Sequence, residues 1–235
     1  ATDLRSPSWL GNYPRELASR KLEFIAADIT DSYSLPAALK GATHAFHFAA
    51  LFNHAAKPDT LMRINAQGTG ILFEAIAKSG IERVIHIGSM SVYGHEQTAK
   101  LGESFAINET KQPNPQDPYA CSKQASRQIA ALFNAHRGLE VAIVDPAGVF
   151  GSHSVYGNVS LIKALLDGFM LLPDGGSHRA SMVHSQDVVR LCDHLMQLKE
   201  LPKGTDPEDI SYLATDTTPV TGRELMELIW EEIPP

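Results

Sequence analysis

"RVIHIGSMSVYG", residues 83–94, is an apolar, strand-like run that ends in small hydroxyl residues and a glycine. A run that is apolar on both faces is typical of a strand covered by helices on both sides of a sheet. In open α/β sheets, ligands bind beyond the carboxyl ends of the strands. We therefore expect Ser89 and Ser91 to lie at a ligand-binding edge, where a hydroxyl can hold a substrate oxygen. Serines that only satisfy the backbone of a turn are the alternative.

Helical patterns alternate with further apolar runs along the chain. The expected strands and the helices between them are residues 22–30, 43–50, 83–89 and 140–150, and residues 61–80 and 119–138. This alternation predicts an α/β fold, a doubly wound parallel sheet with right-handed crossover helices.

The pattern changes after residue 150. We expect a sheet domain over residues 1–150, followed by a small lobe over residues 151–235 that is interleaved with the end of the sheet. The last helix is expected to begin at Thr221, with Glu224 three residues later completing a capping box.

Composition excludes several classes of function. The net charge of −7 and the lack of basic runs argue against nucleic acid or an anionic membrane as a partner. The two cysteines, Cys121 and Cys192, are far apart, and the ten histidines form no ligand-like pair, so we expect neither a disulfide framework nor a metal. No long apolar run or signal peptide is present, which predicts a cytoplasmic protein. The chain starts without methionine, at what looks like a strand end, so we expect it to be part of a longer protein.

Tyr119 and Lys123 lie four positions apart at the start of an expected helix, in "DPYACSK", residues 117–123. This spacing places both side chains on one helical face, where the ammonium can lower the pKa of the phenol. A tyrosine of that kind can transfer protons near neutral pH. An ordinary exposed helix pair is the simpler interpretation of the same spacing.

In their order along the chain, the 83–94 stretch, Tyr119 with Lys123, and "DPAGVFG" at 145–151 resemble the extended short-chain dehydrogenase/reductase superfamily, which includes NAD-dependent epimerases and dehydratases. "HFAA" at 47–50, "INAQGT" at 64–69 and "MVHSQDVV" at 182–189 agree in the same order. The resemblance implies a Rossmann-like fold with a substrate-binding lobe. It also implies a catalytic site in which Tyr119 is the general acid/base, Lys123 lowers its pKa and holds the nicotinamide ribose, and Ser89 binds the reacting oxygen. Ser91 would replace Ser89 if the strand register slipped by two residues.

The same resemblance implies NAD as cofactor. Its expected contacts, besides Tyr119 and Lys123, are Asp3 at the adenosine ribose, Asp28 and Ile29 at the adenine, the backbone of Phe48, Ala49 and Ala50 along the cofactor, and Pro146 at the nicotinamide, with Asn65 as a supporting polar group. Arg5 leaves NADP as the less favoured choice. The family's first strand and glycine-rich loop have no counterpart in this sequence, so cofactor binding by the chain alone stays open.

The resemblance leaves the substrate open. Nucleotide-sugar members commonly carry Arg-Pro-x-Asn where this chain has Asp145 and Gly148 at the arginine and asparagine positions. We expect an NAD-dependent oxidoreductase or epimerase acting on a secondary hydroxyl or carbonyl of a small molecule, of the nucleotide-sugar epimerase/dehydratase type. A ketone or aldehyde reductase or a hydroxysteroid-type dehydrogenase is the alternative, followed by a non-catalytic dinucleotide-binding regulator. The family also implies a homodimer.

Overall fold

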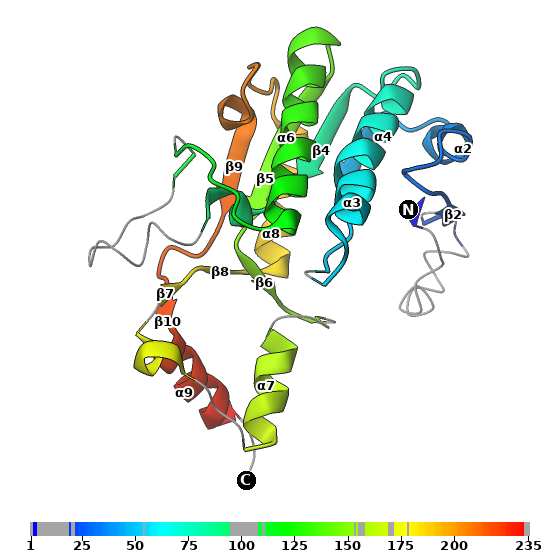
Figure 1. Ribbon diagram of the computed structural model, residues 1–235. Coiled ribbons are helices and arrows are strands. Elements are labelled where there is room, and N and C mark those ends of the chain that lie inside the picture. Colours follow the sequence, from blue (N-terminus) through cyan, green and yellow to red (C-terminus); the bar gives the residue numbers. More distant parts are fainter. Residues whose placement is uncertain are drawn as a thin grey trace.

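The computed structural model describes residues 2–3, 19, 22–53, 55–94, 108–109, 111–152, 154, 158–168, 172–177 and 179–232. At its centre is a four-stranded parallel sheet in the order β3-β4-β5-β9 (Figure 1). These strands are β3 His44–His47, β4 Arg83–Ile87, β5 Glu140–Pro146 and β9 Ser211–Ala214. The predicted α/β class and parallel sheet are therefore confirmed.

Helices lie on both faces of this sheet (Figure 1). Alternate residues along β4 and β5 enter different cores because strand side chains point to opposite faces in turn. One core contains Val84 and Ile143 with helices α4 and α6, and the other contains Ile85 and Val144 with helix α8. Burial of each such side chain contributes about 1.5–3 kcal/mol, which explains why these strands are apolar on both faces.

The described α-helices are α2 Leu35–Leu39, α3 Pro58–Leu61, α4 Thr69–Ile76, α6 Pro118–His136, α7 Asn158–Leu166, α8 Ser185–Gln197 and α9 Gly222–Glu232. Shorter helical segments are the π-helix η2 Met62–Gly68 and the 3-10 turns η3 Met90–Tyr93, η4 Pro173–Gly176 and η5 Pro207–Ile210. Helix α6 begins where the sequence predicts: Asp117 Oδ1 accepts the N–H of Ala120 at 2.9 Å, with Pro118 at the first helical position. This cap places Tyr119 in the first turn.

The helix expected over residues 61–80 is built differently. It starts earlier, in α3, widens into η2 and ends as α4. Within η2, the side chain of Asn65 forms hydrogen bonds with the backbone of Leu51, outside the helix. Short π-helical segments occur frequently at functional sites. At Gly68 a Cβ atom would lie 3.0 Å from Ile29 Cγ1, so the glycine lets the helix approach the turn after β2.

All four expected strands were too long, and two of them differ most from the structure. Of residues 22–30 only β2, Ile25–Ala26, is a strand, and it pairs with β1, Thr2–Asp3, in a separate sheet. Asp28 Oδ1 accepts the Thr30 N–H at 2.7 Å and forms a local turn that ends the strand. The run 140–150 breaks at Ala147, after which β6, Gly148–Phe150, pairs with β8, Met182–His184. Strand β9 was not predicted, because it is short and half polar.

The remaining strands belong to the lower part of Figure 1, where β7, Arg179–Ala180, pairs antiparallel with β10, Val220–Thr221, and α9 follows β10. The predicted capping box is confirmed: Glu224 N–H donates to Thr221 Oγ1 at 3.1 Å, and Thr221 N–H donates to Glu224 Oε2 at 2.7 Å. By contrast, α8 and β9 pack with the main sheet although they come late in the chain.

Candidate functional site

Ser89 and Tyr119 meet at the carboxyl edge of the main sheet. Ser89 follows β4, and its hydroxyl accepts the Ser91 N–H at 3.2 Å and lies 2.9 Å from Ser91 Oγ, so it caps the η3 turn. The Ser89 side chain also hydrogen-bonds the phenol of Tyr119 from the first turn of α6. The turn-capping contacts of Ser89 therefore leave its predicted role in the site possible on geometric grounds.

Tyr119 is buried, and its ring packs edge-on against Phe52 with the ring centroids 5.1 Å apart. Burial raises the pKa of Tyr119 to about 12, although the hydrogen bond from Ser89 acts in the opposite direction. The sequence predicted a lowered pKa. The prediction is wrong for this structure, because the effect of burial dominates and Lys123 does not direct its charge at the phenol.

Lys123 is instead turned toward the sheet, where its Nζ donates to the carbonyl oxygen of Ile87 at 2.5 Å. The side chain is only 4% exposed. Burial lowers the pKa of Lys123 to about 8, while the negative charge of Asp145 pulls it upward. The ammonium is thus held one helical turn from the phenol, at the end of β4.

A second charged group, which sequence reasoning did not assign to the site, lies beneath Ser89. Asp145 Oδ1 accepts the Ser89 backbone N–H at 2.9 Å, and Oδ2 lies 3.1 Å from Arg127 Nη2. Both side chains are fully buried. Burial raises the pKa of Asp145 to about 6, against the opposing effect of Arg127. A charged residue inside the apolar run 140–146 was the available signal.

Arg127 joins several elements around Asp145. Its Nη2 donates to Tyr93 Oη at 3.1 Å and to Ser211 Oγ at 3.0 Å, and its Nη1 pairs with Glu208 Oε1 at 3.3 Å. These partners come from η3, β9 and η5, so one guanidinium ties the site to three neighbouring segments.

Asn65 connects the segment after β3 to helix α6. Its Oδ1 accepts the Leu51 N–H at 2.7 Å, and its Nδ2 donates to Leu51 O and to Ser122 Oγ, both at 3.0 Å. The side chain is buried. This geometry suits the supporting role expected of Asn65, because it fixes the backbone that leads away from β3.

The expected cofactor contacts lie partly at this edge. Phe48, Ala49 and Ala50 are exposed directly beyond β3, which is in register with β4. Pro146 ends β5 and is half-buried. These residues follow the same ends of neighbouring strands as Ser89, which is where the resemblance implies the cofactor.

The adenine-side contacts are less defined. Asp28 and Ile29 are half-buried in the turn after β2, and Asp28 Oδ1 already accepts both the N–H and the hydroxyl of Thr30. Asp3 lies opposite Ala26 in the β1–β2 pair. The side chain of Asp3 and all of Arg5 fall outside the described residues.

His47 and His86 lie beneath this edge on neighbouring strands, with ring centroids 5.0 Å apart. Burial lowers the pKa of His47 to about 3 and that of His86 well below its usual value, so both rings are neutral. They bond Thr69 Oγ1 at 3.0 Å and Ser126 Oγ at 3.1 Å respectively, which is a core role. Within the described part of the chain, no group of three or more His, Cys, Asp or Glu side chains is arranged to hold a metal ion.

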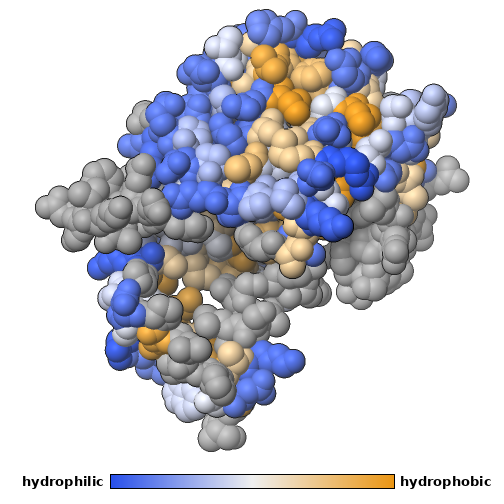
Figure 2. All heavy atoms as spheres, viewed as in Figure 1, coloured by the Kyte–Doolittle hydropathy of each residue, from blue (hydrophilic) through white to orange (hydrophobic). Residues whose placement is uncertain are grey.

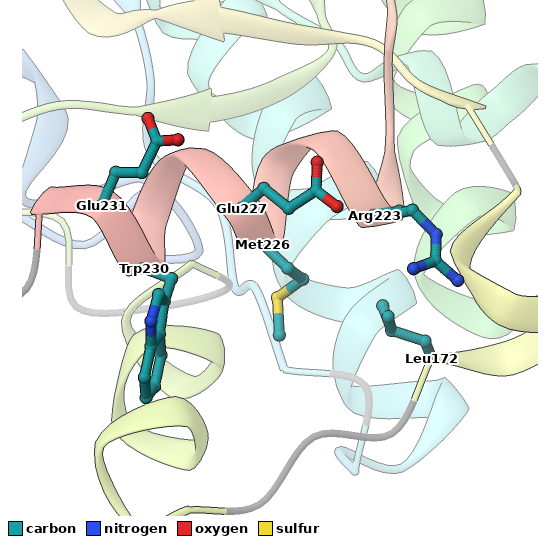
Figure 3. A pocket seen from close by; sticks show the side chains of 6 residues that line it. All are labelled: Leu172, Arg223, Met226, Glu227, Trp230 and Glu231. Atoms are coloured by element: carbon teal, nitrogen blue, oxygen red, sulfur yellow. The ribbon is translucent and has the colours of Figure 1, made fainter.

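A separate cavity of about 360 Å³ lies along α9, lined by Leu172, Arg223, Met226, Glu227, Trp230 and Glu231. Figure 3 shows Met226 and Trp230 extending from one side of α9, with Glu227 and Glu231 on the other. None of the predicted site residues lines this cavity. None of the helices described combines the length and the apolar character needed to cross a membrane.

The arrangement at the sheet edge can transfer a proton to or from a bound oxygen. The phenol of Tyr119 and the hydroxyl of Ser89 are joined by a hydrogen bond, so a single substrate oxygen can reach both. Lys123 adds a buried positive charge nearby.

Comparison with known proteins places this site in context. The family described as the NAD dependent epimerase/dehydratase family matches residues 6–208. The dTDP-glucose 4,6-dehydratase of Streptomyces antibioticus is 24% identical over 227 residues, covering 94% of this chain and 63% of that protein. The 3 beta-hydroxysteroid dehydrogenase type 7 of Rattus norvegicus is 27% identical over 175 residues, covering 70% of this chain and 50% of that protein. The chain therefore spans between half and two thirds of the length of these relatives.

Among solved structures, a double mutant of the dTDP-glucose 4,6-dehydratase DesIV from Streptomyces venezuelae, with NAD bound, has a similar fold. Its TM-score is 0.80 at 25% sequence identity, and the match covers 98% of this chain and 70% of that one.

Proposed function

Because the chain belongs to the NAD dependent epimerase/dehydratase family, we propose that it carries the catalytic site of an enzyme that uses NAD to oxidise or reduce a secondary hydroxyl or carbonyl. The observation that carries the proposal is the hydrogen-bonded pair of Ser89 and Tyr119, with Lys123 one turn away, at the carboxyl edge of a parallel sheet. Retention of all three residues favours an enzyme over a dinucleotide-binding regulator.

Bound NAD supplies the hydride acceptor or donor. The chain's own residues then bind the reacting oxygen and move its proton. Ser89 holds that oxygen through its hydroxyl, and Tyr119 gives or takes the proton at Oη. With a pKa near 12, the free phenol keeps its proton at neutral pH and is ready to donate it. The oxidising direction needs a lower pKa, which a closer approach of the Lys123 ammonium provides.

For the substrate we propose a nucleotide sugar, as the dTDP-glucose 4,6-dehydratases similar to this chain suggest. The second candidate is an apolar secondary alcohol, as in a hydroxysteroid-type dehydrogenase. Exposed Phe52, Val149 and Phe150 support this second candidate, because they place apolar surface at the carboxyl ends of the strands. NADP remains the less favoured cofactor.

The proposal includes two expectations about the protein's surroundings. The free thiols of Cys121 and Cys192 suit the cytoplasm. A homodimer would form through the outer faces of η2, α4 and α6, where Met62 and Leu132 are exposed. Figure 2 shows apolar surface among polar surface over this side of the molecule.

The proposal is tested by mixing the complete protein and NAD with a panel of nucleotide sugars, sterols and simple secondary alcohols. Absorbance of reduced nicotinamide and product composition are followed together. Accumulating reduced cofactor identifies a dehydrogenase, and a changed sugar without net reduction identifies an epimerase or dehydratase. No turnover of any class, in a protein shown to bind NAD, would reject the enzymatic proposal.

A further inference from the structure

Asp145 acts on the backbone from which the Ser89 side chain projects. Its Oδ1 accepts the Ser89 N–H at 2.9 Å, and Ser89 in turn caps η3 and bonds Tyr119. A shift of this carboxylate would therefore move the Ser89 hydroxyl relative to the phenol. The sequence resemblance gives Asp145 no such role, since the related nucleotide-sugar enzymes commonly have arginine there.

The neighbouring glycine shows that the chain is built around this contact. A Cβ atom on Gly88 would lie 1.8 Å from Asp145 Oδ1 and 3.1 Å from Ile143 Cγ2. Gly88 is buried at the end of β4, so no flexible surface group could yield. The absence of a side chain at position 88 is what lets the carboxylate reach the Ser89 N–H.

Charged and polar groups enclose Asp145 from the neighbouring elements. Helix α6 supplies Arg127 and Lys123, β9 supplies Ser211, η3 supplies Tyr93, and η5 supplies Glu208 through its pair with Arg127. Burial, together with the positive charges of Lys123 and Arg127, lowers the pKa of His86 on β4, so its ring is neutral. A buried carboxylate is costly unless it is paired, and Arg127 at 3.1 Å provides that pairing. The same carboxylate attracts the ammonium of Lys123.

We propose that Asp145, held by Arg127, is a positioning residue that fixes Ser89 through its backbone N–H. This inference rests on the proposed function of Ser89, Tyr119 and Lys123. Under this proposal the buried Arg127–Asp145 pair contributes to the reaction and not only to the packing of the core.

The test is Asp145→Asn in the complete protein. The amide keeps the shape and an acceptor oxygen but removes the charge. We expect kcat to fall roughly 10- to 100-fold with little change in KM, because the single amide oxygen cannot accept from both the Ser89 N–H and Arg127, so Ser89 is displaced. The pKa of Lys123, measured by NMR of ¹³Cε-labelled lysine in the cofactor-free protein and assigned with Lys123→Arg, should fall by about one unit. The alkaline limb of the kcat profile should move to lower pH by a similar amount.

Arg83→Lys is the matched control, since it alters a buried arginine–carboxylate pair that faces α8 and leaves the site untouched. It should leave kcat and the Lys123 pKa unchanged. If Asp145→Asn also leaves both unchanged, the positioning role is overturned. A shifted Lys123 pKa in a protein that turns over no substrate would overturn the proposed function and support the placement of Asp145.

If Asp145→Asn does not fold, as judged by circular dichroism, Arg127→Lys replaces it. This variant keeps a positive charge beside Asp145 but cannot also reach Tyr93 and Ser211. The carboxylate is then ionised less readily, so the acid limb of kcat, expected near pH 6 in the parent, should move toward neutral pH. An acid limb that stays in place would contradict the proposal.

Discussion

Each edge of the main sheet contains a buried arginine paired with an acid, and the two pairs differ in what else they bind. At the amino edge, Arg83 pairs with Glu140 and donates to the carbonyl oxygens of Leu195, Met196 and Leu198 at the end of α8. At the carboxyl edge, Arg127 pairs with Asp145 and binds side chains. Arg83 thus donates hydrogen bonds to the last carbonyl oxygens of α8, which have no partner within the helix.

The second pair is less completely satisfied. Among the described residues, Arg127 Nε, Asp145 Oδ2 and Glu208 Oε1 are buried without a hydrogen bond of good geometry. The other carboxylate oxygen of Asp145, Oδ1, accepts the backbone N–H of Ser89. We therefore expect the two ion pairs to differ in role: the amino-edge pair should contribute to stability, and the carboxyl-edge pair should contribute to the proposed site.

The largest effect is expected from Tyr119→Phe, which tests whether the carboxyl edge of the sheet is the reacting site. Removal of the phenolic oxygen should lower kcat by roughly 10²- to 10⁴-fold, because the proton transfer loses its donor and acceptor. NAD affinity, measured by fluorescence titration, should change little. Unchanged turnover in a folded, NAD-bound variant would mean that the carboxyl edge is not the reacting site.

A smaller effect is expected from Gly88→Ala. The new methyl group would overlap Asp145 Oδ1, and overpacking of this kind costs about 1–3 kcal/mol of unfolding free energy. Urea denaturation measures the loss, and kcat should fall with it. Gly70→Ala is the control: its nearest neighbour, Ile129 Cδ1, lies 3.9 Å from the added Cβ, so this helical change should stabilise by roughly 0.5–1 kcal/mol.

Arg83→Lys tests whether the ion pair at the amino edge contributes to stability without affecting the site. Lysine cannot serve Glu140 and the α8 carbonyls together, so we expect a loss of about 1–3 kcal/mol. Thermal and urea denaturation measure it. Because this pair does not contact the site, kcat should stay at the parental value; a large fall in kcat would show that the two edges are not independent.

A pH dependence of stability is also expected, although the charge of Arg127 offsets part of the burial cost. The pKa of Asp145 is raised to about 6 in the folded protein, so between its ordinary value near 4 and pH 6 the folded state binds more protons than the unfolded state. The contribution of Asp145 to stability therefore falls as pH rises through this window. Compared with Asp145→Asn, the parent should lose stability from pH 4 to 6; the opposite slope would show that Arg127 overcompensates.

Local patterns predicted the parts of the fold and site that depend on nearby residues. The spacing of Tyr119 and Lys123 and the Thr221 capping box depend on neighbours within one helical turn. The role of Asp145 depends on Arg127 and on the missing Cβ of Gly88, which lie far away in the sequence. The orientation of Lys123 toward Ile87 O likewise depends on the packing of α6 against β4. No single-sequence pattern reports such contacts.

The break of the chain at Ala147 connects the strand that carries Asp145 directly to a strand of a second sheet. Strand β5 carries Asp145, and one residue after β5 ends, β6 begins its pairing with β8. Strand β8 continues without a connecting loop into α8, on the far face of the main sheet. Phe150, the last residue of β6, therefore lies only five positions after Asp145 in the chain, and its partner strand β8 runs straight into α8.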